Sequence, residues 1–205
     1  MKFTLLVITD GRDEYCIRSL VSALENLPSP ERVVLVDDRT HELGFAGAIQ
    51  HGWDQILATD AEWVFHLEAD FLFNGPVDLD AMAELAADEH VCQVALKRQP
   101  WNEQEKKAGG IVELDPDSFE EGEVRHRYRP YVLGSYTAHR KCFTTNPCLY
   151  RRDIAERGWP QEPESEGKFG IELFKDPAIV STYWGAKFDP PMVTHIGEVR
   201  AGNGY

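Results

Sequence analysis

Apolar positions in the first hundred residues follow two alternating patterns. Continuous apolar runs rich in β-formers occupy residues 3–9, 32–38 and 62–67, which predicts buried strands of a parallel sheet. Apolar residues recur at helical spacing over 13–27 and over 44–57, so each of these stretches predicts a helix between two strands. A β-α-β-α-β order with short connections predicts a parallel sheet with right-handed crossovers, and therefore an α/β fold.

The pattern is less regular in the second half of the chain. A long polar excursion covers residues 98–123, and shorter apolar segments follow it. The further elements that the pattern predicts are helices at 79–88 and 168–175, a short helix that ends at Gly158, and strands at 91–96, 131–133, 142–145, 179–184 and 192–195. We expect a single domain, with residues 1–97 as one half and residues 98–205 as the other.

Length and composition suit one domain with a core. The chain has 205 residues, 42% of them hydrophobic, and no run approaches the ~18 apolar residues of a membrane span. The apolar N-terminus leads into charged sequence without a small-residue cleavage site, so we expect a core strand and not a signal peptide. Four cysteines without CxxC spacing favour reduced thiols in a cytoplasmic protein. The oligomeric state stays open.

Charge is distributed unevenly along the chain. The net charge of −14 argues against a protein that coats nucleic acid by charge alone. Residues 125–152 nevertheless contain seven Lys or Arg and no Asp or Glu, whereas the preceding segment 113–123 is strongly acidic. The basic stretch is either a surface for an anionic ligand or a solvated strand face that the acidic loop neutralises.

Polar residues stand at the carboxyl end of each of the first three predicted strands. They are Thr9, Asp10, Asp37, Asp38, Glu68 and Asp70. Ligands of open α/β sheets bind outside these strand ends, so the residues are candidates for a binding site. Capping and turn formation are the alternative roles, above all for Asp10 and Asp37.

Glu68 and Asp70 flank Ala69 directly after an apolar run. In extended backbone the two carboxylates would point the same way, and they would repel each other unless a cation lay between them. Mg²⁺ and Mn²⁺ prefer carboxylate oxygens and typically bind one or two of them together with substrate phosphates. The tripeptide therefore predicts a site for a divalent metal and a diphosphate.

Three stretches of the first half resemble nucleotide-sugar glycosyltransferases of the glycosyltransferase-A (GT-A) fold, in the style of the family 2 enzymes. They are LLVITDGRDEYCIRSLVSALEN, VVLVDDRT and LGFAGAIQHGWDQILATDAEWVFHLEADFLF, all within residues 3–74. In that family the third strand ends in an acid-x-acid motif, in which Asp is commoner than the Glu68 of this chain. The resemblance implies a mostly parallel central sheet flanked by helices, with a smaller acceptor-side region of strands and loops.

The resemblance also implies a function and residue roles. It implies a metal-dependent, inverting transfer of a sugar from a nucleotide-sugar, with a UDP-sugar as the expected donor and Mn²⁺ or Mg²⁺ as the cofactor. Asp70 matches the more consistent metal ligand of the family, whereas a lone histidine such as His195 is more often structural than a ligand. The implied metal ligands are Asp70, Glu68 and His195, and the implied donor contacts are Thr9, Asp10, Arg12, Asp38, Glu68 and Arg200.

Inverting transfer requires a general base for the acceptor hydroxyl. The segment 142–198 resembles the part of the family that supplies this base, although the usual adjacent Glu-Asp pair is missing. Glu172 is the first candidate, because its apolar sequence context could bury it and raise its pKa. Glu166 and Asp176 are alternatives, and Glu172 could instead cap a helix or form an ion pair.

Two other functions stay open at this point. A nucleotidyltransferase would share the sheet and the metal, but its first loop would usually be rich in glycine and basic. A non-catalytic nucleotide-sugar-binding module is the third option. Small glycosyltransferases of this fold resemble enzymes of bacteriophages, some of which glycosylate hydroxymethylated DNA bases. Such a role would place the protein in the host cytoplasm, with residues 125–152 as the surface that binds DNA. Saccharide, lipid-linked and protein acceptors are equally open, and Trp101 is among the aromatic candidates for a sugar platform.

Overall fold

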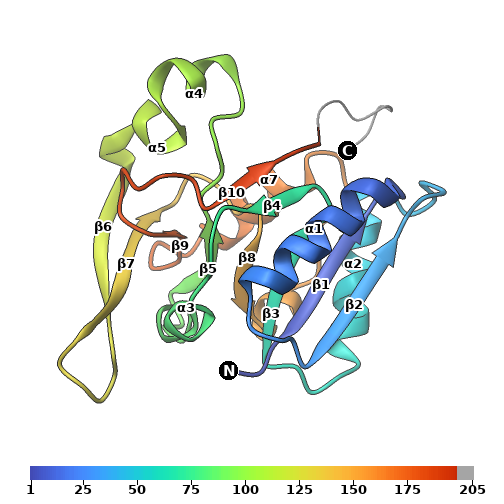
Figure 1. The fold of residues 1–205 in the computed structure, drawn as a ribbon, viewed down its shortest axis with the longest axis horizontal. Coiled ribbons are helices and arrows are strands. Elements are labelled where there is room, and N and C mark those ends of the chain that lie inside the picture. The colour runs from blue at the N-terminus through green and yellow to red at the C-terminus, as the bar shows by residue number, and fades with distance from the viewer. Residues whose placement is uncertain (198–205) are drawn as a thin grey trace.

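An eight-stranded sheet with the strand order β2-β1-β3-β8-β5-β9-β7-β6 forms the centre of the molecule (Figure 1). The computed structural model describes residues 1–197. The strands are β1 (Thr4–Thr9), β2 (Arg32–Asp37), β3 (Trp63–Glu68), β4 (Phe71–Phe73), β5 (Val91–Leu96), β6 (Phe119–Arg125), β7 (Val132–His139), β8 (Cys148–Arg151), β9 (Val180–Trp184) and β10 (Val193–His195). The helices are α1 (Asp13–Asn26), α2 (Gly44–Leu57), α3 (Leu79–Ala86), α4 (Glu103–Ala108), α5 (Ile111–Leu114), α6 (Arg152–Ala155), α7 (Ser165–Leu173) and the 3₁₀ helix η1 (Pro116–Ser118).

Strand directions follow from the pairings. β1 is parallel to β2 and β3, and β5 is parallel to β9. β8 is antiparallel to both β3 and β5, and β7 is antiparallel to both β9 and β6. Six of the eight strands therefore point one way and β7 and β8 the other, which confirms the expected mostly parallel sheet. Since β8 lies between β3 and β5, strands from both sides of residue 97 share this sheet.

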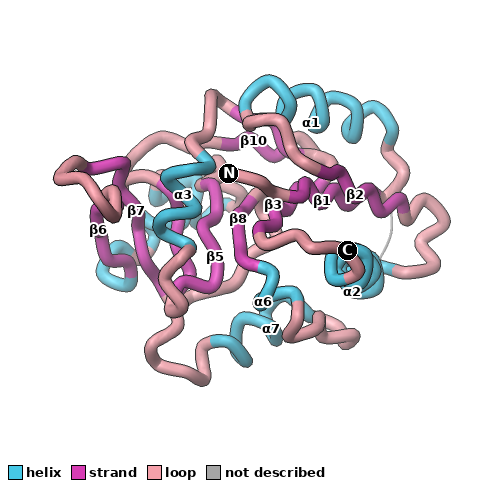
Figure 2. Tube along the Cα trace, turned by 90° about the horizontal axis from the view of Figure 1, so that it is seen from below, coloured by secondary structure: helices cyan, strands magenta, loops and turns pink. Residues whose placement is uncertain are grey.

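β1 is buried along its whole length because helices cover both faces of the sheet at this point. Leu5 and Val7 face α1, whereas Leu6 and Ile8 face α2. Figure 2 shows α1 on one side of β1 and β3 and α2 on the other. Gly52 allows the close approach of α2, because a Cβ at this position would lie 2.7 Å from a methyl carbon of Leu6.

The prediction that residues 32–38 form a buried strand is wrong for one of its faces. β2 is the edge of the sheet, and its Val33 and Leu35 are 50% and 49% exposed. These two side chains lie on the face that α1 covers over β1, but the helix does not reach across them. The apolar positions at helical spacing in α1 are largely exposed as well, at 62% for Ile17, 49% for Val21 and 58% for Leu24, and the buried positions of this helix are Cys16, Ser19 and Ala23.

The second half differs more from the predicted pattern. Residues 142–145 are not a strand but an irregular segment that leads into β8. The polar excursion 98–123 contains α4, α5, η1 and the start of the β6–β7 hairpin. β10 pairs with β4 in a separate two-stranded sheet, which carries the chain back to the end of β3. No helix within residues 1–197 is long and apolar enough to cross a membrane.

Candidate active site

The candidate active site lies at the carboxyl ends of β1 and β3. β3 ends at Glu68, and Ala69 and Asp70 form a turn before β4. Asp70 is 1% exposed, and its backbone carbonyl accepts a hydrogen bond from the N–H of Ile196 at 2.7 Å. The antiparallel pairing of β10 with β4 therefore brings His195 beside Asp70.

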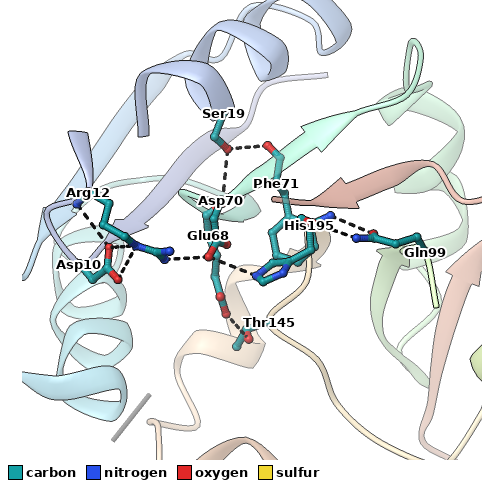
Figure 3. Close-up of polar contacts among 9 residues, drawn as sticks. All are labelled: Asp10, Arg12, Ser19, Glu68, Asp70, Phe71, Gln99, Thr145 and His195. Atoms are coloured by element: carbon teal, nitrogen blue, oxygen red, sulfur yellow. Dashed lines mark hydrogen bonds and ion pairs between the residues drawn. The ribbon is translucent and has the colours of Figure 1, made fainter. Parts of the chain in front are cut away.

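One oxygen of Asp70 has two cationic or basic neighbours. Nη2 of Arg12 donates to Asp70 Oδ2 at 2.9 Å, and Nε2 of His195 lies 3.2 Å from the same oxygen (Figure 3). Nε of Arg12 also donates to Asp10 Oδ1 at 2.8 Å. Burial disfavours the charge on Arg12, but its hydrogen bonds to Asp10 and Asp70 outweigh this effect and raise its pKa above the ordinary value.

His195 is held on three sides by neighbours from distant parts of the sequence. Its ring lies 4.8 Å from that of Phe71 and 4.4 Å from that of Trp101, measured between ring centroids. The side-chain amide of Gln99 accepts from the backbone N–H of His195 and donates to its carbonyl, both at 2.9 Å. These contacts fix the imidazole with its Nε2 towards Asp70.

Gly197 closes over Asp70 and Arg12. A Cβ at this position would lie 2.2 Å from Asp70 Oδ2 and 3.2 Å from Nη1 of Arg12. The first distance is far below van der Waals contact, so any larger residue would displace the carboxylate. The backbone of Gly197 is thus one wall of the site.

Glu68 turns to a different set of partners. The hydroxyl of Thr145 donates to Glu68 Oε1 at 2.5 Å and lies 3.1 Å from Glu166 Oε1, to which the backbone N–H of Thr145 donates at 2.6 Å. Our expectation that Glu68 and Asp70 would point at the same place therefore fails. The strand alternation ends at Glu68, and the turn that follows directs Asp70 towards Arg12 and His195 (Figure 3).

The site opens into a cleft of about 1070 Å³. This volume is at the upper end of the range of about 300–1,000 Å³ that is typical of small-molecule sites. The lining includes Glu68, Arg98, Trp101, Thr145, Glu166 and His195. A second, much smaller cavity next to the cleft is bordered by Thr9, Asp10, Arg12, Glu68 and Asp70.

Most residues that the sequence predicted for the donor and the metal lie together. They are Thr9, Asp10, Arg12, Glu68, Asp70 and His195. Asp38 is close to them, since its N–H donates to the carbonyl of Thr9 at 2.9 Å, and its carboxylate accepts from the N–H of Leu43 at 3.1 Å. Arg200 lies outside the described residues.

The expected burial of Glu172 is wrong. Its side chain is 68% exposed on the outer face of α7 and forms an ion pair with Lys175 at 2.5 Å. Asp176 is also exposed, and it accepts from the N–H of Ala178 at 2.9 Å. Of the three carboxylates considered as the general base, Glu166 is the one that lines the cleft.

Three residues of the site were not predicted as such. Thr145 had been assigned to a strand, and Gln99 and Gly197 to no role, whereas Trp101, a candidate for a sugar platform, does line the cleft. Their contacts join segments that are far apart in the sequence, so local patterns carry little signal for them. Gly197, as a glycine two residues after a candidate histidine, was the most accessible hint.

The stretch 125–152 does not form one basic surface. Arg140, Arg151 and Arg152 donate to backbone carbonyls, in the last two cases at the ends of α3 and α2. Lys141 is paired with Asp115, and Arg125 with Glu123. Part of the stretch thus consists of arginines that are bonded to backbone carbonyls. Another part is the exposed tip of the β6–β7 hairpin, which projects from the body of the molecule (Figure 1).

Asp70 and His195 fit a divalent cation. Two ligands at about 2.1 Å from one cation and at a right angle to each other lie about 3 Å apart. The distance of 3.2 Å between Asp70 Oδ2 and His195 Nε2 is close to this value. Within residues 1–197 no group of three or more His, Cys, Asp or Glu side chains is arranged to hold a metal ion. Water and substrate phosphates commonly supply the remaining ligands of such a cation.

No protein-family model and no curated protein sequence matches the chain. Among solved structures, it is similar to residues 1–349 of TarS from S. aureus in complex with UDP, with 16% identity and a TM-score of 0.55, over 95% of this chain and 60% of that one. It is also similar to the mannosyltransferase PcManGT from Pyrobaculum calidifontis in complex with GDP-Man and Mn²⁺, with 14% identity and a TM-score of 0.57, over 97% of this chain and 58% of that one. The chain thus spans less than two thirds of the length of either protein. What the similarity establishes is the architecture: the chain has the α/β GT-A fold of glycosyltransferases.

Proposed function

We propose that this protein is a glycosyltransferase that moves a sugar from a nucleotide-sugar donor to an acceptor hydroxyl, with Mn²⁺ or Mg²⁺ as the cofactor. The observation that carries the proposal is the meeting of Asp70, His195 and Arg12 at the carboxyl ends of β1 and β3, beside a cleft of about 1070 Å³. Ligands of open α/β sheets bind at such strand ends. The metal and the nucleotides bound to the two similar structures support the same class of donor.

The donor would lie with its diphosphate near Asp70. A UDP-sugar is the donor we propose, with Thr9, Asp10 and Arg12 beside the nucleotide and Asp38 facing its ribose or base. Arg200 belongs to this proposal as a phosphate contact, on sequence grounds alone. Asp70 and His195 would hold the metal, and Glu68 would act on it through water or on the donor directly. When bound, the metal neutralises charge on the leaving diphosphate.

We propose Glu166 as the general base in place of Glu172. It lines the cleft, and the backbone N–H of Thr145 fixes one of its oxygens at 2.6 Å. A base for an inverting reaction must reach the acceptor hydroxyl from within the site. Glu172, at 68% exposure and paired with Lys175, does not meet this requirement.

We propose a saccharide acceptor ahead of a DNA acceptor. Arg140, Arg151 and Arg152 are occupied with backbone carbonyls, so they are poorly placed to bind a phosphate backbone. A hydroxymethylated DNA base stays in the acceptor panel as the second candidate. A nucleotidyltransferase is disfavoured, because the first loop contains a single glycine, Gly11, and no glycine-rich cradle for a triphosphate.

The test is a turnover assay with a panel of UDP- and GDP-sugars, Mn²⁺, and saccharide and hydroxymethylated-DNA acceptors. Release of nucleoside diphosphate and the mass of the acceptor report transfer. We expect turnover that requires the metal and that falls at least ~1,000-fold in Asp70→Asn. Full metal-dependent activity of that variant would contradict the site assignment. Binding of UDP without turnover on any acceptor would favour a non-catalytic module.

A further inference from the structure

Arg12 flanks the oxygen that we propose for the metal. Its Nη2 lies 2.9 Å from Asp70 Oδ2, the oxygen that is also 3.2 Å from Nε2 of His195. A cation bound between Asp70 and His195 would therefore share that oxygen with a guanidinium. Arg12 is permanently charged, so it cannot relieve this conflict by losing a proton.

The guanidinium is held from a second direction as well. Asp10 accepts from its Nε at 2.8 Å, and the guanidinium carbon lies 4.8 Å from the ring centroid of Tyr15. The side chain of Arg12 is nevertheless 28% exposed, compared with 2% for Asp70. Arg12 is thus anchored at its Nε, while its outer nitrogens are placed at the edge of the site.

We propose that Arg12 is a cationic gate at this site: it opposes the binding of a divalent metal alone and favours the joint binding of metal and nucleoside diphosphate. The inference rests on the proposed function and names the residue that couples its two ligands. Without ligands, Arg12 neutralises Asp70. With both ligands present, its outer nitrogens donate to the diphosphate, while Asp10 still holds Nε.

Local charge gives the reason. A divalent metal on Asp70 Oδ2 would lie a few ångströms from the Arg12 guanidinium at a nearly buried carboxylate, and both cations are positively charged. Like charges at such a separation in a partly buried site repel strongly. The negative charge of a nucleoside diphosphate attracts both cations, so metal and diphosphate each raise the affinity for the other.

A purely structural role of Arg12 predicts something different. If the arginine only braced Asp10 against Asp70, its removal would loosen Asp70 and weaken every ligand of the site. The gate predicts opposite changes, with metal alone bound more tightly and diphosphate bound less tightly. The two roles can therefore be separated by the sign of one measurement.

The experiment uses Arg12→Gln and measures binding, not activity. Mn²⁺ alone is titrated by electron paramagnetic resonance, and UDP is titrated by calorimetry at saturating Mn²⁺. We expect Mn²⁺ alone to bind about tenfold more tightly than to the wild type, and UDP to bind about tenfold more weakly. Arg125→Gln is the matched control, since it removes the same charge at an exposed pair with Glu123 on β6, and it should change neither affinity.

A second variant keeps the proposal testable if Arg12→Gln does not fold, as judged by circular dichroism. Arg12→Lys keeps the positive charge but loses the planar guanidinium, which can donate two hydrogen bonds to one phosphate. Its affinity for Mn²⁺ alone should stay within about threefold of the wild-type value, whereas its affinity for UDP should fall. Weakening of both ligands in Arg12→Gln, or a change in neither, overturns the gate and leaves the proposed function standing. Failure of the wild type to bind UDP with Mn²⁺ overturns both.

Discussion

Replacing Thr145 by valine tests the link between the two carboxylates of the cleft. Valine has nearly the volume of threonine but lacks the hydroxyl, so the 2.5 Å bond to Glu68 and the 3.1 Å contact with Glu166 are lost. The backbone N–H of residue 145 can still donate to Glu166, as it does at 2.6 Å. The change therefore removes one donor and leaves the main-chain anchor of the proposed base.

The expected size of the effect follows from this single hydrogen bond. A hydrogen bond to a charged group contributes about 1.5–3 kcal/mol. Thr145 is 5% exposed, so bulk water replaces the hydroxyl poorly. Since about 1.4 kcal/mol is a factor of ten, kcat should fall roughly 10- to 100-fold, while the KM for the donor rises less than about threefold.

The assay is the initial rate of UDP release over a range of UDP-sugar concentrations at saturating Mn²⁺. Thr145→Ser keeps the hydroxyl and should stay within about threefold of the wild-type kcat. A valine variant as active as the wild type would refute the reasoning. A serine variant as slow as the valine variant would refute it too, provided that both keep the wild-type melting temperature.

Three further predictions concern the carboxylates, the glycine wall and a buried histidine. Glu166→Gln should lower kcat at least ~100-fold, whereas Glu172→Gln, at an exposed ion pair, should change kcat and stability very little; equal losses in the same rate assay would contradict the choice of base. Gly197→Ala should weaken Mn²⁺ binding in the presence of UDP about tenfold, because its Cβ would lie 2.2 Å from Asp70 Oδ2; unchanged binding in calorimetry would show that the wall yields. Burial, aided by the nearby charge of Lys141, lowers the pKa of His139 from 6.5 to about 4. Between pH 6.5 and 4 the unfolded state therefore binds a proton that the folded state does not, and the free energy of unfolding falls as the pH drops through this range. In thermal melts, His139→Gln should lose less stability over this range than the wild type.

Local periodicity predicted the first half of the fold well and failed where the position within the sheet matters. The helix at 44–57 and the strand at 91–96 have the predicted bounds. The run at 32–38 looks as apolar as a central strand, but whether a strand lies at the edge depends on which others join the sheet. Within residues 1–197, β2 pairs with β1 alone, and the strands that come later in the sequence join the sheet on the far side of β3.

The helix α7 shows what the sequence could have revealed about the base. Phe169, Gly170 and Leu173 are its buried positions, together with Ser165. Glu166 lies three, four and seven residues before the first three of them, which is the spacing of one helix face. Glu172 lies next to Leu173 in sequence but about 100° away around the helix, so its apolar neighbours do not bury it. Helical phase, not sequence neighbourhood, was the relevant signal.

The loop after β5 and the C-terminal strand hold His195 as one unit. Backbone contacts join residues 97–98 to 192–193, and the side chain of Gln99 then takes the place of a further strand by exchanging two hydrogen bonds with the backbone of His195. Trp101 packs edge-on against the imidazole at 4.4 Å and also lines the cleft. A cleft ligand that displaces Trp101 would therefore remove one of the contacts that hold the imidazole. The loop after β5 and the proposed metal ligand are thus in direct contact, which no pattern in either segment of the sequence indicates.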